Sequence, residues 1–229
     1  MPRLLLIETS TSLCSTALAE DGRIVCSRRS TEPRAHASLT AVFVKEMLEE
    51  SGWTVRELDA VAVSAGPGSY TGLRVGSSTA KGLCFGGQVP LIAVSTLDIL
   101  ARQAIEAGLP EGCKAILPMV DARRMEVYTA VFSPEGTRLT DISPVILDEN
   151  SFADLFASGP VAVIGDAAEK FAPLRATADG SVFMQCCPEA SAMLVPAMRK
   201  YEKKEFEDTA YFDPFYLKQF IATTPKKLF

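Results

Sequence analysis

The chain has 229 residues, of which 48% are apolar and 22% are charged. This length fits one large domain or two small ones, and the composition excludes a disordered, collagen-like or low-complexity chain. The sequence contains no apolar run long enough to span a bilayer and no signal-peptide core, so we expect a cytosolic protein without membrane contact.

The charge balance and the supply of metal ligands narrow the function further. The 23 basic and 28 acidic residues give a net charge of −5, whereas proteins that bind nucleic acid unaided usually carry a basic stripe that neutralises phosphates. The six cysteines form no Cys-x-x-Cys pair, and His36 is the single histidine. We therefore predict no direct binding of RNA or DNA, no metal site and no cofactor.

The first half of the chain alternates between strand and helix patterns. Three extended runs come first, and a turn signal at Asp21-Gly22 joins the second run to the third. A helix with apolar residues on nearly two faces follows, and Gly52 ends it. The predicted elements are strands at residues 3–7, 13–19 and 23–28, a helix at 36–50, a strand at 59–64, a helix ending near 85, a strand at 90–94 and a helix at 95–107.

The same order of elements starts again after about residue 110. In each half the first strand leads to an acid, and a glycine turn follows at a similar distance: Gly22 is 14 residues after Glu8 (22 − 8), and Gly136 is 15 after Asp121 (136 − 121). The second half has predicted strands at 116–120, 126–132, 138–147 and 161–165 and a short helix at 150–157. We predict an α/β protein with an internal duplication into two βββαβα halves, residues 1–109 and 110–229, of which the second is degenerate.

The C-terminal segment is rich in aromatic residues and too apolar for a free end. We expect Tyr211, Phe215 and Tyr216 to dock onto the rest of the protein. Residues 224–229 are expected to fray.

A duplicated plan with an acid after the first strand of each half resembles the actin, hexokinase and Hsp70-like ATPases, which share a ribonuclease H-like fold. In that architecture two hairpins after the acids wrap the phosphates of ATP, and small residues let backbone N–H groups approach the phosphates. Glu8-Thr-Ser-Thr11 meets this need, but Asp121-Ala-Arg-Arg124 carries two bulky arginines. We therefore expect a vestigial phosphate site.

A glycine-rich segment at residues 64–74 follows a predicted strand and opens a helix. Backbone N–H groups at a helix N-terminus favour an anion, yet the segment lacks the Gly-Lys-Ser/Thr of a P-loop and the spacing of a dinucleotide motif. Two interpretations stay open, an anion-binding turn and a tight strand-to-helix turn. The candidate vestigial anion site consists of Glu8, Thr9, Ser10, Gly66, Gly68, Ser69 and Asp121, and we identify no catalytic residue.

Five segments carry a more specific resemblance. They are Glu8-Thr-Ser-Thr11, the single His36, Gly66-Pro-Gly-Ser-Tyr-Thr-Gly-Leu-Arg-Val-Gly76 with Ala80-Lys-Gly82, Asp121-Ala-Arg-Arg-Met-Glu-Val-Tyr128, and Pro214-Phe-Tyr-Leu217. Together they resemble the TsaB family, also called YeaZ or glycoprotease-like, whose members are accessory subunits in bacterial tRNA threonylcarbamoyladenosine biosynthesis. The resemblance is strong over residues 1–130 and thinner from 135 to 205.

This resemblance implies a partner, the related catalytic subunit TsaD. TsaD uses a metal held by a His-x-x-x-His pair to transfer a threonylcarbamoyl group onto the adenosine next to the anticodon of tRNA. The small ATPase TsaE would join the pair, and tRNA would be met only through the complex. Because His36-Ala-Ser-Leu-Thr40 lacks the second histidine, the implied role is that of a non-catalytic scaffold or activator subunit.

The resemblance also implies that the first helices of the two subunits pack as a bundle. The predicted partner interface consists of His36, Leu39, Val42, Phe43, Met47, Leu73, Arg74, Ser77 and Lys81. The same apolar patch would support a homodimer of the isolated chain. The alternative function is an active actin-like ATPase or small-molecule kinase that uses Glu8 and Asp121. A peptidase is less favoured, because the sequence offers neither a serine triad nor a His-Glu-x-x-His motif.

Overall fold

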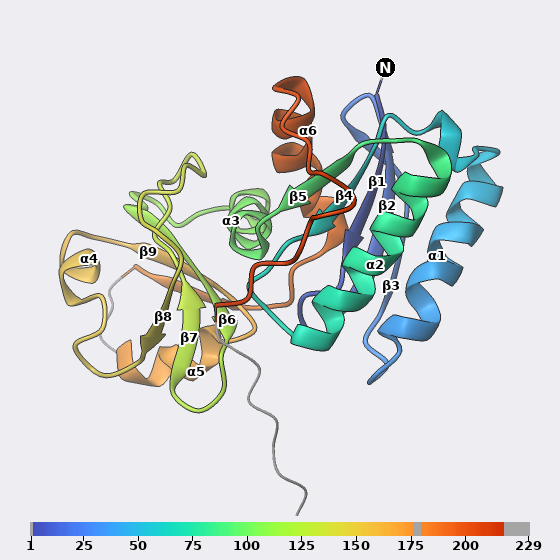
Figure 1. Cartoon of the computed structure of the whole chain (residues 1–229). Helices are drawn as coiled ribbons and strands as arrows, with labels where there is room; N and C mark the ends of the chain where they lie inside the picture. Colours follow the sequence, from blue (N-terminus) through green and yellow to red (C-terminus); the bar gives the residue numbers. More distant parts are fainter. Residues whose placement is uncertain (1, 176–179, 218–229) are drawn as a thin grey trace, which may run out of the picture.

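The structure, a computed structural model, describes residues 2–175 and 180–217 and contains two mixed five-stranded sheets (Figure 1). The strand order is β3-β2-β1-β4-β5 in the first sheet and β8-β7-β6-β9-β10 in the second. The central strand β1 pairs antiparallel with β2 and parallel with β4, and β6 repeats this arrangement with β7 and β9. The predicted internal duplication is therefore confirmed.

The first half follows the predicted order closely. It comprises β1 (Arg3–Glu8), β2 (Cys14–Glu20), β3 (Arg23–Ser30), α1 (His36–Ser51), β4 (Ala60–Ser64), α2 (Tyr70–Gly87), β5 (Leu91–Val94) and α3 (Thr96–Ala107), with a 3-10 turn at Val55–Glu57. Helix α1 ends where Gly52 takes a left-handed backbone conformation. The side chains of Ser69 and Ser95 accept hydrogen bonds from backbone N–H groups at the starts of α2 and α3, as expected of N-cap residues. Helices α1 and α2 lie side by side on one face of the first sheet (Figure 1).

The second half has the same number of strands as the first half, but its helices are much shorter. It comprises β6 (Ala115–Asp121), β7 (Glu126–Thr129), β8 (Ser143–Ile146), α4 (Ala153–Ala157), β9 (Val161–Gly165), α5 (Ala168–Phe171) and β10 (Val182–Gln185), with a 3-10 turn at Ala172–Arg175. Helices α4 and α5 have 5 and 4 residues, whereas α1 and α2 have 16 and 18. Strands β7 and β8 are shorter than predicted, because the chain between them pairs only through isolated bridges at Phe132. The predicted degeneracy of the second half is confirmed.

Helix α3 lies between the two sheets (Figure 1). Its Leu97, Leu100 and Ala104 side chains join a buried cluster with β6 and β9 of the second sheet. Its Ile99 side chain joins a cluster with β1 and β4 of the first. Apolar burial on both sides of one helix couples the two halves. Within residues 2–175 and 180–217, no helix is both long and apolar enough to cross a membrane.

The end of the chain returns to the first sheet. A 3-10 turn (Ala190–Met193) and α6 (Leu194–Glu202) pack against β1, β2, β4 and β5. The following tail runs along the first half, where the N–H groups of Glu207 and Phe215 donate to the carbonyls of Leu91 (2.9 Å) and Ala65 (2.7 Å). Phe212 and Pro214 of the tail are buried, whereas Tyr211 is 85% exposed. The prediction that Tyr211 docks is wrong, and residues 224–229 lie outside the described part.

Candidate functional site

The hairpin between β1 and β2 is buried at every residue except Ser12. Glu8, Thr9 and Ser10 have no exposed area, and the backbone N–H of Ser10 donates to a carboxylate oxygen of Glu8. Burial raises the pKa of the Glu8 carboxyl to about 7, although the hydrogen bond from the Ser10 N–H opposes this shift. Glu8 Oε2, Ser10 Oγ and Thr11 Oγ1 are buried without a hydrogen-bond partner in the described part of the chain. The inside of the hairpin is therefore polar but closed to solvent.

The glycine-rich segment closes this hairpin. A Cβ atom at Gly68 would lie 2.2 Å from the Ser10 carbonyl oxygen, and one at Gly72 would lie 2.1 Å from the Thr9 carbonyl oxygen. The Ser69 N–H donates to that Ser10 carbonyl at 2.6 Å, and the Thr9 hydroxyl donates to the Gly72 carbonyl at 2.8 Å. The segment is thus a tight strand-to-helix turn whose glycines allow backbone to touch backbone, and Ser69 acts as the N-cap of α2.

The hairpin between β6 and β7 is open instead. The Asp121 side chain is 45% exposed and accepts a hydrogen bond from the ammonium of Lys170. It also accepts from the Arg123 N–H at 2.8 Å, while the Asp121 N–H donates to Asp166. Arg123 and Arg124 have φ values of 72° and 52°, a left-handed conformation that glycine adopts more readily.

The two acids do not form one site. Glu8 is buried under the glycine-rich turn, and Asp121 is engaged by a cation at the surface. A triphosphate held by both hairpins does not fit these residues, because the backbone of the first hairpin already contacts the turn at 66–72. Among the described residues, no group of three or more His, Cys, Asp or Glu side chains is placed to hold a metal ion.

The predicted partner residues divide between the core and the surface. Met47, Leu73 and Ser77 are buried within this chain, so their side chains offer no surface to a partner, and the interface assignment is corrected at these positions. His36 Nε2 lies 3.0 Å from the Thr11 carbonyl, and the Lys81 ammonium donates to two carbonyls of the tail. Those that remain at the outer surface of α1 and α2 are Leu39, Val42, Phe43 and Arg74, with Leu39 and Phe43 half-buried.

Sequence reasoning missed the most exposed apolar side chain of α2. Phe85 is 78% exposed, and Val42 on α1 is 44% exposed. Beside Phe85, a Cβ atom at Gly82 or Gly86 would meet no other atom within 4 Å. We call the exposed set Val42, Ser78, Gly82, Phe85 and Gly86 the α1–α2 face. The Gly82-x-x-x-Gly86 spacing with an aromatic residue inside it is the signal that could have revealed this surface.

Comparison with known proteins gives concordant results. A family model described as "TsaD: tRNA N6-adenosine threonylcarbamoyltransferase" matches residues 29–211. The Escherichia coli protein TsaB, named for tRNA threonylcarbamoyladenosine biosynthesis, is 30% identical over 232 residues, 96% of each chain. The Haemophilus influenzae TsaB is 38% identical over 135 residues, which cover 59% of this chain and 56% of the relative.

Solved structures support the same relationship. The structure of YeaZ from Pseudomonas aeruginosa superposes with a TM-score of 0.78 at 26% identity, covering 95% of this chain and 100% of that one. A dehydratase activator from Clostridium difficile, solved with bound ADPNP, reaches a TM-score of 0.51 at 9% identity over 89% of this chain and 96% of that one, a likeness of fold alone. The predicted duplicated actin-like fold is confirmed, and the chain belongs to the TsaB (YeaZ) family.

Proposed function

We propose that this chain is a non-catalytic subunit of tRNA threonylcarbamoyladenosine biosynthesis and that it pairs in the cytosol with the catalytic subunit TsaD. The names of its curated relatives support the pathway, and the match to the TsaD model supports descent of both subunits from one fold. The ATPase TsaE is the proposed third member.

The single observation that carries the pairing is the α1–α2 face. Exposed apolar side chains that gather on one surface often mark a site for a partner, and Phe85 and Val42 stand exposed on two helices that lie side by side. The open positions Gly82 and Gly86 let a partner helix come close to the backbone of α2. We propose that helices of TsaD cover this face, with Leu39, Phe43 and Arg74 at its rim. Without TsaD, two copies of this chain would pair through the same face.

The absence of catalysis is supported by the two hairpins. The first hairpin is filled by the chain's own glycine-rich turn, and Asp121 of the second is neutralised by Lys170. The net charge of −5 gives no basic surface that would hold tRNA phosphates unaided. The transfer reaction and the main tRNA contacts are therefore assigned to TsaD, and this chain acts through its contact with TsaD.

The test is co-purification of tagged TsaD with this chain. Phe85→Asp introduces a charge into the proposed contact and should abolish co-purification. Ile146→Asp is the matched control, because Ile146 is 73% exposed but lies on β8 of the second half. Retention of TsaD by the Phe85 variant, with a native circular dichroism spectrum, would contradict the assigned face. Threonylcarbamoyl transfer by the purified chain without TsaD would contradict the non-catalytic role.

A further inference from the structure

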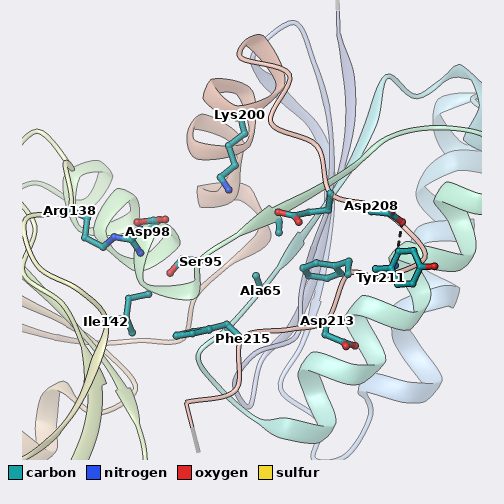
Figure 2. Close-up of a pocket in the computed structure, with 14 residues that line it drawn as sticks. Ala65, Ser95, Asp98, Arg138, Ile142, Lys200, Asp208, Tyr211, Asp213 and Phe215 are labelled. Atoms are coloured by element: carbon teal, nitrogen blue, oxygen red, sulfur yellow. Dashed lines mark hydrogen bonds between the residues drawn. The ribbon is translucent and has the colours of Figure 1, made fainter.

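A cavity of about 570 Å³ lies between the two halves, on a different set of residues from either hairpin. Figure 2 shows its walls, which come from the ends of β4 and β5, the start of α3, α6, the connection before β8 and the C-terminal tail. No residue of the hairpins 8–11 and 121–124 or of the α1–α2 face lines it. Its volume is in the range of small-molecule sites, and a junction between domains is a common place for them.

Two basic and four acidic side chains line the cavity, and one of the acids, Asp208, already accepts hydrogen bonds from the N–H groups of Ala210 and Tyr211. Lys200 points from α6 into the cavity, and Arg138 approaches from the connection before β8 (Figure 2). The acids Glu207 and Asp213 belong to the C-terminal tail. Within the described residues, none of these last four side chains forms a hydrogen bond, and no ion pair within 4 Å joins them to each other or to another residue. Opposite charges that line one cavity without pairing leave a gap that a ligand with both charges would bridge.

Asp98 lies at the start of α3, beside Arg138 in Figure 2. Burial raises the pKa of its carboxyl, and the nearby Arg138 and Lys200 pull that pKa back down. The environment is therefore partly dehydrated, which strengthens interactions between charges there. Asp98 offsets part of the positive charge of the two cations, which leaves a net positive charge for a ligand carboxylate.

Apart from Ser95, Asp208 and Tyr211, the remaining lining is apolar. Ile142 approaches from the second half, and Phe212 and Phe215 approach from the tail. Small residues, Ala65 and Ala93, form the part of the wall contributed by the first sheet. A ligand with charged ends therefore also needs an apolar portion to cover these side chains.

We propose that this cavity binds a small zwitterionic molecule, an amino acid or a dipeptide with an apolar side chain. Its carboxylate faces Arg138 and Lys200, and its ammonium group faces Glu207 and Asp213. The cations supply donors for a carboxylate, and the tail carboxylates accept from an ammonium group. The apolar side chain rests on Ile142 and the tail phenylalanines.

The first test uses the full chain and isothermal titration calorimetry with L-leucine and glycyl-L-leucine. Two probes each lack one charge of leucine: isocaproate lacks the ammonium group, and isoamylamine lacks the carboxylate. We expect leucine or the dipeptide to bind and both single-charge probes to bind at least about tenfold more weakly. Failure of both zwitterions to bind, or equal binding of all probes, overturns the proposal.

The second test places the ligand in this cavity. Arg138→Gln and Glu207→Gln should each weaken binding of the better zwitterion by about tenfold or more. The matched controls Arg23→Gln and Glu111→Gln change exposed residues away from the cavity and should leave binding unchanged. Equal binding by the cavity variants and the controls would place the ligand elsewhere and overturn the assignment.

Discussion

The two hairpins that follow Glu8 and Asp121 occupy equivalent places in the duplicated halves but have opposite environments. The first is buried, and the glycine-rich turn packs onto its backbone. The second is exposed, with its acid paired to Lys170. Arg123 and Arg124 nevertheless keep the left-handed backbone that glycine favours. One copy is thus a packing centre and the other a surface turn, although both keep the same place in the fold.

The largest expected effect comes from breaking the packing of the first hairpin. In Gly68→Ala the new Cβ atom would lie 2.2 Å from the Ser10 carbonyl oxygen, and the neighbouring atom is backbone, which cannot rotate away. We expect a loss of about 3 kcal/mol in the free energy of unfolding, since overpacking of rigid contacts is among the costliest substitutions. Thermal denaturation should show a fall in Tm of roughly 6–12 °C.

The control for this variant is Gly82→Ala on the outer surface of helix α2, which follows the glycine-rich turn. A Cβ atom there meets nothing within 4 Å. Because alanine is the better helix former, this change should stabilise the protein by about 0.5–1 kcal/mol. Equal stability losses in the two variants would mean that helix α2, not the hairpin contact, determines the effect.

The fold of the first half was predictable because its signals are local. Strand and helix periodicity, the Asp21-Gly22 turn and the caps at Ser95 and Gly52 each act within a few residues. The return of α6 to the first sheet was not predicted. It depends on contacts such as Met193 with β1, which join residues far apart in the chain and leave no local pattern.

The residues of the candidate site could be predicted from the sequence, but whether each is buried or exposed could not. The acids and the glycines could be identified from the sequence. Only the structure shows that the backbone at Gly68 and Gly72 packs directly against the hairpin. Helix α1 is apolar on nearly two faces, so periodicity alone could not assign Met47 to the core and Val42 to the surface. The face that a helix buries is decided by the sheet beneath it.

A smaller effect, specific to pH, is expected from the buried acid itself. The pKa of Glu8 rises from 4.5 to about 7 on folding, so between these values the folded chain holds a proton that the unfolded chain has released. The contribution of Glu8 to stability is then greatest below about pH 4.5, falls as the pH rises towards 7 and levels off above it, a loss of about 3 kcal/mol. Glu8→Gln should remove this slope and be more stable than the parent at about pH 8, offset by imperfect hydrogen bonding of the amide.

Urea unfolding at about pH 5 and pH 8 measures this slope. Glu57→Gln serves as the control, because hydrogen bonds from Thr54 lower the pKa of Glu57 and its titration falls below this range. The slope of that variant should match the parent protein. A Glu8→Gln protein that keeps the full parental slope would show that another group carries the pH dependence.

The smallest effect is expected at the second hairpin. Asp121→Asn removes the charge that pairs with Lys170 but keeps an oxygen for the Arg123 N–H. Since Asp121 is 45% exposed, the loss in unfolding free energy should stay below about 1 kcal/mol. It should also shrink in high salt, which screens surface ion pairs, whereas the effect of Gly68→Ala should not depend on salt. Lys170→Met also removes the hydrogen bond to the Glu126 carbonyl, so combining it with Asp121→Asn should cost no more than Lys170→Met alone, because the ion pair is already lost. A loss as large as that from Gly68→Ala would mean that the second hairpin is also a packing centre, and the contrast between the halves would then fail.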